Sequence, residues 1–366
     1  MRFLYYCNST YQLLNLLNLH WHRKNAGFED IPDYHADLLL LNTFDDASQI
    51  KRIVEDDKAF DRIIFIDKAF NTGVFHSLIT LIDAFSPSFY MKDKYGIDKK
   101  DIADIYDVIM APKYSMVVDQ IWKLNTKAKL HLYEDGIGSY YDDVPFDPRS
   151  SIVRKVNQLK GCHSFREYEK LYLVEKRMYC GKDTEKATQI PKYDAAYLEH
   201  VKQLFRDYSF NNYGNKDIFW LSQFLNNAEY NVMVDEVLQK FLPYKEETLF
   251  CQHPRKHLEN KYGYDESDKK QIWEMKLLNM EDIEKKLFVS IHSTACFSAK
   301  MLFDYEPYVL LFYKLGSLEV AHVTPEFEMI IEKFMASYRD PKKVMIPENM
   351  EELENCIKTY IETIKK

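Results

Sequence analysis

Two adjacent carboxylates, Glu134 and Asp135, are the residues of this sequence best suited to chemistry. They follow residues 130–133, where leucines alternate with a histidine and a tyrosine, as at the end of a strand. A carboxylate at the carboxyl end of a strand can take a proton from an incoming hydroxyl, and open α/β sheets bind ligands at that end. Gly136 would allow a positive φ and a close approach of substrate. An ordinary turn uses the same residue types, so this stretch alone does not establish a site.

A histidine follows another predicted strand, at residues 248–251. His253 is succeeded by Pro254, and the proline would stiffen the turn that presents the imidazole. An imidazole in this place can donate to a phosphate or protonate a leaving group. A surface turn is the simpler interpretation of this pair when it is taken alone.

A pair of hydroxyls, Ser293 and Thr294, lies between a predicted strand at residues 287–291 and a predicted helix. Hydroxyls and backbone N–H groups at the start of a helix can bind an anion, although the same residues are common helix caps. Ser290, inside the strand, is a second candidate for this role. The sequence has neither the GxxxxGK[ST] nor the GxGxxG phosphate loop.

The elements that must position these residues alternate between strands and helices. Predicted strands lie at residues 3–6, 38–41, 63–66, 105–110, 129–133, 218–221, 248–251, 287–291 and 308–312. Predicted helices lie at residues 11–19, 48–55, 195–208, 228–241, 325–338 and 348–364. This alternation predicts an α/β fold with parallel sheets, and the continuous apolar strands are typical of sheets covered on both faces. Ser9 or Thr10 is the predicted N-cap of the first helix.

The length of 366 residues favours two domains. Strand signals become sparse near residues 148–208, which predicts a helical insertion there. The turn-rich stretch at residues 211–215 predicts a linker. We therefore expect a first domain at residues 1–212, a second domain at 213–347 and a C-terminal helix at 348–366.

Composition excludes several classes of function. The net charge of -8 argues against a general nucleic-acid binder, and no apolar run is long enough to span a membrane. The six cysteines are scattered without a CxxC pair, which predicts reduced thiols and neither a zinc site nor a disulfide framework. The amino-terminal residues predict a strand and not a signal peptide, so we expect a cytoplasmic protein.

Residues 149–177 are locally basic within this acidic chain. A solvated helix face is the simpler interpretation. The functional alternative is contact with an anionic acceptor or with a membrane, which would place the protein peripherally at the inner face of the plasma membrane.

Taken together, these stretches resemble the bacterial sialyltransferases of the lipooligosaccharide and capsule type. That family carries a D/E-D/E-G motif, an HP motif and an S-S/T motif in this order. Here they are Glu134-Asp135-Gly136, His253-Pro254 and Ser293-Thr294. The opening sequence STYQLLN, at residues 9–15, looks like the first strand–helix junction of the family.

The resemblance implies a GT-B fold, with two Rossmann-like domains facing a central cleft. It also implies inverting, metal-independent transfer of sialic acid from CMP-sialic acid to a glycan acceptor, such as a terminal galactose of capsule or lipooligosaccharide. No cofactor is implied beyond this donor substrate. Dimers occur in the family, so a homodimer is one alternative, and the oligomeric state stays open from the sequence.

The resemblance also assigns roles. Asp135 becomes the general base, with Glu134 beside it, and His253 becomes the residue that binds the donor phosphate and protonates the departing CMP. The first domain becomes the acceptor side and the second the donor side. The implied donor-binding residues are Ser293, Thr294, His253, Pro254, Gly136 and Ser290.

Two alternatives remain open from the sequence. The first is a related enzyme, either a polysialyltransferase or a glycosyltransferase that uses another nucleotide sugar. The second is a non-catalytic, nucleotide-sugar-binding subunit of a capsule assembly complex. Donor hydrolysis separates the two, because a non-catalytic subunit would bind CMP but release none from the donor.

Overall fold

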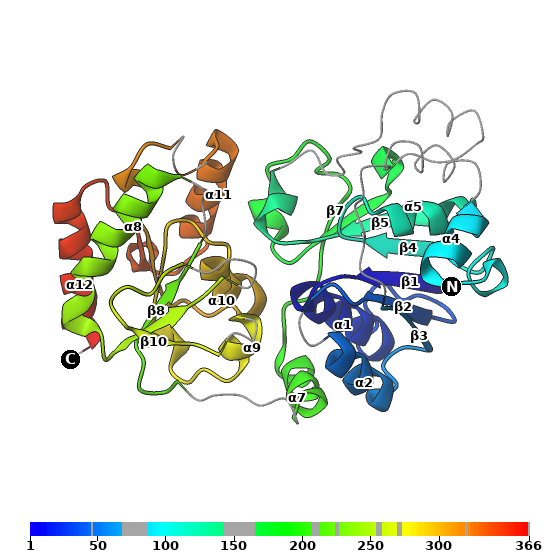
Figure 1. The fold of residues 1–366 in the computed structure, drawn as a ribbon. Helices are drawn as coiled ribbons and strands as arrows, with labels where there is room; N and C mark the ends of the chain where they lie inside the picture. Colours follow the sequence, from blue (N-terminus) through cyan, green and yellow to red (C-terminus); the bar gives the residue numbers. More distant parts are fainter. Residues whose placement is uncertain are drawn as a thin grey trace. The chain divides into compact units, whose positions relative to one another are not determined.

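The computed structural model describes residues 1–44, 47–67, 87–141, 165–206, 213–223, 227–253, 258–268, 273–318, 321 and 323–364. The chain forms two compact units, each with its own sheet (Figure 1). The first unit comprises Met1–Pro191 and Ala195–Phe205, and the second comprises Lys192–Asp194 and Arg206–Lys366.

The first unit contains a parallel sheet with the strand order β3-β2-β1-β4-β5-β6-β7. Its strands are β1 (Arg2–Cys7), β2 (His35–Leu41), β3 (Arg62–Ile66), β4 (Val108–Ala111), β5 (Lys129–Tyr133), β6 (Lys170–Leu173) and β7 (Ala187–Gln189). The leucine run at residues 38–41 is buried throughout, as expected for a strand covered on both faces. Because β5 lies between β4 and β6, the residues after these three strands share one edge of the sheet.

Helices cover both faces of this sheet. They are α1 (Thr10–Asn25), α2 (Ala47–Asp57), α4 (Pro87–Tyr95), α5 (Met116–Lys123) and α7 (Ala195–Leu204), with short 3-10 turns η1 (Lys99–Asp101), η2 (Ile137–Tyr140), η3 (Phe165–Glu167) and η4 (Lys176–Met178). Figure 1 shows α1, α2 and α7 on one face and α4 and α5 on the other. The predicted cap of the first helix is confirmed, since the Ser9 hydroxyl accepts a hydrogen bond from the Gln12 backbone N–H at 3.3 Å.

The predicted helical insertion is wrong for the part of it that the structure describes. Between residues 165 and 194 the chain forms β6 and β7, which continue the parallel sheet of the first unit. β7 has only three residues, whereas β6 has four, as many as the strands predicted at residues 218–221 and 248–251. The helix predicted at residues 195–208 is present as α7, whereas residues 148–164 lie outside the described residues.

The second unit contains a parallel sheet with the strand order β10-β9-β8-β11-β12-β13. Its strands are β8 (Ile218–Leu221), β9 (Thr248–Cys251), β10 (Asp265–Glu266), β11 (Leu287–Ser290), β12 (Tyr308–Leu311) and β13 (Val344–Met345). Its helices are α8 (Ala228–Lys240), α9 (Trp273–Leu278), α10 (Ala295–Phe303), α11 (Pro325–Ala336) and α12 (Met350–Ile364), with 3-10 turns η5 (Leu242–Tyr244), η6 (Ile283–Lys285), η7 (Tyr313–Leu315) and η8 (Pro341–Lys343). β8 lies between β9 and β11, so the ends of these three strands are neighbours.

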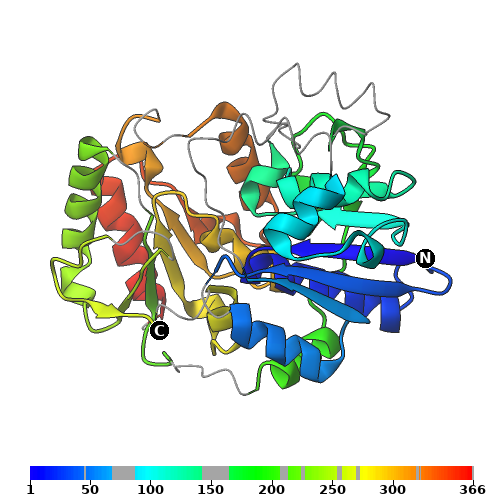
Figure 2. The same ribbon diagram turned by 45° about the vertical axis from the view of Figure 1, so that its right-hand side comes forward.

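The carboxyl-terminal helix is an integral part of the second unit. Leu353 and Tyr360 of α12 are buried, and the Tyr360 hydroxyl donates to the backbone carbonyls of Asp217 and Lys285 at 2.9 and 3.0 Å. Figures 1 and 2 both show α12 beside α8. The separate segment predicted at residues 348–366 is therefore not separate.

The boundary between the units also differs from the prediction. The second unit begins at Arg206, before the predicted division at residue 212. Residues 207–212, where the predicted boundary falls, lie outside the described residues. In the part of the chain that the structure covers, no helix combines the length and the apolar character needed to cross a membrane.

Candidate functional site

Glu134, the first of the two acidic residues after β5, is buried and anchors the surrounding chain. Only 1% of its surface is exposed, and its Oε2 accepts the Val174 backbone N–H at 2.9 Å. The hydroxyls of Tyr11 and Tyr140 donate to Oε1 and Oε2. These partners lie on α1, in η2 and after β6, so Glu134 ties three segments to the end of β5.

The two tyrosines remain donors over the whole physiological pH range. Burial, and after it the charge of Glu134, raises the pKa of Tyr11 and of Tyr140 well above the ordinary tyrosine value. Three donors on two oxygens suit an ionised carboxylate, which only accepts hydrogen bonds. The arrangement favours a structural role for Glu134, which holds the segments around the end of β5 together.

Asp135 is the accessible carboxylate of the pair. Its side chain is 22% exposed. The Gln12 amide nitrogen donates to Oδ1 at 2.5 Å, and the Lys113 ammonium lies 2.8 Å from Oδ2. The Asp135 backbone N–H donates to the Ser139 hydroxyl at 2.9 Å, which closes the turn that follows. Asp135 is therefore oriented on both sides and can still be reached from solvent.

Gly136 adopts a conformation that other residues rarely take. Its φ is 97° and its ψ is -169°, outside the left-handed helical region that asparagine or aspartate can enter. Among the residues that the structure describes, and apart from the two chain neighbours, no atom lies within 4 Å of the place where a Cβ would sit, so the requirement for glycine comes from the backbone. The glycine lets the chain leave β5 sharply and enter η2.

In the second unit, the ends of three neighbouring strands are tied together by hydroxyl groups. The His253 backbone N–H donates to the Ser222 hydroxyl at 2.8 Å, which connects the ends of β9 and β8. The Ser290 hydroxyl donates to the Leu221 carbonyl at 2.8 Å and accepts the Ser293 N–H at 3.2 Å. Ser290 is 1% exposed, so its hydroxyl is engaged inside the unit. This favours a supporting role for Ser290.

The predicted hydroxyl pair stands directly before α10. The Ser293 hydroxyl accepts the Ala295 N–H at 3.3 Å, and Thr294 is exposed without capping the helix through its side chain. His253 follows β9 on the same edge of the sheet, with β8 between the two positions. Pro254 lies outside the described residues. The strand order thus places His253, Ser293 and Thr294 at one edge of this sheet.

Several residues that shape these two edges were not predicted from the sequence. Gln12 and Lys113 hold Asp135, and Ser222 holds the turn at His253. His292 bonds to the Ala321 carbonyl through Nε2 at 2.6 Å and to the Gln223 amide through Nδ1 at 3.2 Å. Only Gln12 could have been found, since it lies in the stretch at residues 9–15 that resembles the family.

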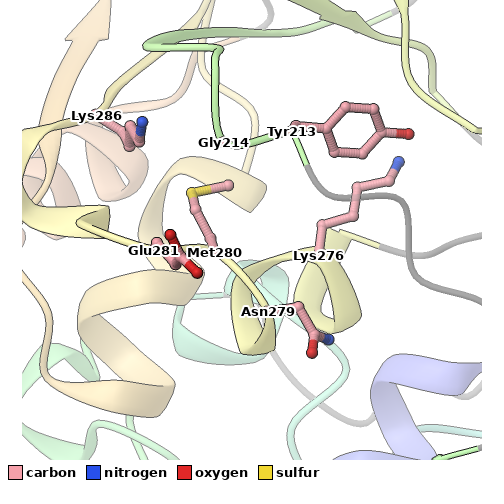
Figure 3. Close-up of a pocket in the computed structure, with 7 residues that line it drawn as sticks. All are labelled: Tyr213, Gly214, Lys276, Asn279, Met280, Glu281 and Lys286. Atoms are coloured by element: carbon pink, nitrogen blue, oxygen red, sulfur yellow. The ribbon is translucent and has the colours of Figure 1, made fainter.

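A small pocket in the second unit lies away from these residues (Figure 3). It is lined by Tyr213, Gly214, Lys276, Asn279, Met280, Glu281 and Lys286. Gly214 precedes β8 and Lys286 precedes β11, so the pocket is at the amino ends of the strands, opposite to His253. The Lys276 ammonium already donates to the Ser267 hydroxyl and the Asp268 carbonyl at 2.9 and 3.0 Å. The pocket contains none of the predicted site residues.

Solved structures are similar to this chain to different degrees. A putative UDP-N-acetylglucosamine 2-epimerase from Listeria monocytogenes is 11% identical, with 99% of this chain and 88% of that chain covered and a TM-score of 0.55. The S. aureus MnaA–UDP structure is 12% identical over 99% and 89% of the two chains, with a TM-score of 0.49. E. coli heptosyltransferase WaaC with ADP is 12% identical over the full length of both chains, with a TM-score of 0.40. No family model and no curated protein matches the sequence.

The fold class follows from the sheets and from the first of these similarities. Two parallel sheets, each interleaved with helices, are two Rossmann-like units. Together with the similarity to the Listeria protein, they show the GT-B fold. Fold alone does not determine a reaction, so the function has to be argued from the site.

Proposed function

We propose that this protein is a glycosyltransferase that moves a sugar from a nucleotide-sugar donor to a glycan hydroxyl. The observation that carries the proposal is Asp135, an accessible carboxylate oriented by two partners at the carboxyl end of β5. The Listeria structure with the same fold is named for a nucleotide-sugar substrate, which supports this class of donor. The motif resemblance supports the finer proposal that the donor is CMP-sialic acid.

In the proposed reaction, the first unit supplies the base. The acceptor hydroxyl oxygen attacks the anomeric carbon of sialic acid, and its proton passes to Asp135. The bond between the anomeric carbon and the CMP phosphate oxygen breaks, and its electron pair leaves with CMP. One attack from the face opposite the leaving group inverts the configuration at the anomeric carbon.

The second unit supplies the groups for the departing phosphate. His253 donates a proton or a hydrogen bond to the leaving oxygen, and the hydroxyls of Ser293 and Thr294 bind the phosphate. These donors are polar and require no metal ion. Because CMP is already a good leaving group, polar donors that stabilise its negative charge as it departs are sufficient.

Peripheral membrane contact is a separate proposal, which rests on the basic stretch at residues 149–177. Of the basic stretch at residues 149–177, the part before residue 165 lies outside the described residues. In the remainder, Lys170 pairs with Glu29 at 2.6 Å and Arg177 with Glu175 at 2.8 Å. These pairs neutralise part of the local positive charge, which leaves less of it to attract a membrane or an anionic acceptor.

A donor and acceptor screen tests the function. Purified protein is incubated with CMP-sialic acid, UDP-sugars and ADP-sugars, with and without galactose-terminated glycans, and released nucleotide and product linkage are measured. We expect release of CMP and a sialylated product. Nucleotide binding without any turnover would support the non-catalytic subunit, and an epimerised UDP-sugar would identify a different enzyme with the same fold.

Two variants test the roles. Asp135→Asn should lower turnover on the order of 10²–10⁴-fold while CMP binding, measured by calorimetry, is retained. His253→Ala should slow both hydrolysis and transfer, and a donor with a better leaving group should recover part of that rate but none of the rate lost in Asp135→Asn. Asp33→Asn, on an exposed turn of the first unit, is the matched control. Wild-type turnover in Asp135→Asn would refute the base assignment.

A further inference from the structure

The side-chain amide of Gln12 is buried, and both its oxygen and its nitrogen are held by hydrogen bonds. It is 1% exposed and lies in the first turn of α1. Its Oε1 accepts the Asn8 backbone N–H at 2.9 Å and also faces the Tyr133 hydroxyl at 3.4 Å. Because Oε1 accepts the Asn8 N–H, the amide nitrogen must face Asp135, where it donates to Oδ1 at 2.5 Å.

The backbone around Gln12 is held as firmly as its side chain. Ser9 caps the helix by accepting the Gln12 N–H. The Tyr133 hydroxyl donates to the Tyr6 carbonyl at 2.6 Å, which ties the end of β5 to β1 although β4 lies between them. Gln12 therefore approaches Asp135 from a rigid frame.

The two oxygens of Asp135 differ in how firmly they are held. Oδ1 is bonded to the buried Gln12 amide, whereas Oδ2 is paired with Lys113, whose side chain is 64% exposed. Exposed ion pairs are weak and exchange their partners with solvent and ligands. A substrate hydroxyl can thus compete for Oδ2 far more readily than for Oδ1.

We propose that Gln12 is a positioning residue for Asp135, and this inference rests on the proposed transferase function. Gln12 holds Oδ1 throughout the reaction and leaves Oδ2 as the atom that takes the proton of the acceptor hydroxyl. The proton leaves Oδ2 for solvent after product release. Lys113 is the resting partner that the acceptor hydroxyl displaces.

Gln12→Met keeps the size of the side chain but removes the donor. We expect kcat for transfer to fall about 10–100-fold, because a small misplacement of a reacting group is costly. Donor hydrolysis by water and CMP binding should change less than about threefold, since they depend on the second unit. A role in packing alone would lower all of these rates together with the melting temperature.

Gln12→Glu gives a second readout that packing cannot explain. It places a carboxylate at hydrogen-bond distance from Asp135, and two such carboxylates share one proton. The acid limb of the pH–rate profile for transfer should therefore shift toward higher pH by about one pH unit or more. This variant also serves if Gln12→Met does not fold, because it keeps the length of the side chain.

Gln120→Met is the matched control. Gln120 is 2% exposed on α5 of the same unit, and its Oε1 accepts no hydrogen bond from any residue that the structure describes. Its replacement should leave kcat and the pH profile unchanged. If the wild-type protein turns over no nucleotide sugar, the proposed function fails; if it does, a Gln12→Met kcat within twofold of wild type and an unmoved pH profile in Gln12→Glu overturn this inference alone.

Discussion

Glu134→Gln is expected to cost about 3 kcal/mol of unfolding free energy. The carboxylate accepts hydrogen bonds from Tyr11, Tyr140 and the Val174 N–H. A hydrogen bond to a charged group contributes roughly 1 kcal/mol more than a neutral one, and three of them change here. The substituted amide also carries an NH₂ group that cannot accept, so at least one buried donor must turn away or lose its partner.

Urea unfolding followed by circular dichroism measures this cost directly. The midpoint should fall in Glu134→Gln, with an unchanged slope against urea concentration. Asp135→Asn provides the comparison, because it loses an exposed ion pair with Lys113 and should cost only about 1 kcal/mol or less. Glu134→Gln should thus mainly lower the free energy of unfolding, whereas Asp135→Asn should mainly lower turnover.

The opposite result would reverse the roles. If Glu134→Gln unfolds like the wild type and loses turnover as strongly as expected for Asp135→Asn, then Glu134 is the reacting carboxylate. The buried position of Glu134 would in that case have to open during the reaction.

Three further predictions follow from the described residues. Burial lowers the pKa of His20 to about 4 and that of His131 to about 3, from the ordinary histidine value of 6.5. Below pH 6.5 the unfolded chain therefore binds more protons at these two residues than the folded chain does. The free energy of unfolding should therefore fall by about 3 kcal/mol between pH 6.5 and pH 5, and a level profile in denaturant titrations would contradict this. Gly136→Ala should cost about 1–3 kcal/mol, because alanine is strained at a φ of 97°, and should also lower turnover by displacing Asp135. Transfer should persist in excess EDTA, because the predicted phosphate donors are hydroxyl and imidazole groups; loss of activity that Mg²⁺ or Mn²⁺ restores would show that these donors do not suffice.

Several strands were predictable because burial on both faces leaves a continuous apolar run in the sequence. The leucines at residues 38–41 and the run at residues 287–290 show this clearly. β7, β10 and β13 were not predicted, since they have only two or three residues and β10 consists of Asp265 and Glu266. β6 was also missed, although its four residues equal the length of strands that were predicted. Such strands exist because a neighbouring strand offers hydrogen bonds, which sequence alone does not reveal.

The site was predictable only in part, for a related reason. Strand ends place polar residues at a sheet edge, which is how Asp135, His253 and Ser293 could be selected. Some of their hydrogen-bond partners come from distant parts of the chain: Gln12 is 123 residues away from Asp135, and Ser222 is 31 residues away from His253. No local pattern indicates which distant side chain will reach a given carboxylate.

The difference between Glu134 and Asp135 follows from the geometry of an extended chain. Successive side chains of a strand point to opposite sides, so two adjacent carboxylates cannot share one environment. Here the first meets Tyr11, Tyr140 and the Val174 N–H inside the unit, and the second faces the edge. The buried carboxylate fixes the end of β5 and the turn at Gly136, and that turn decides where Asp135 stands. The three residues of this motif therefore act together: buried Glu134 makes the end of β5 rigid, Gly136 forms the turn, and accessible Asp135 is the base that we propose.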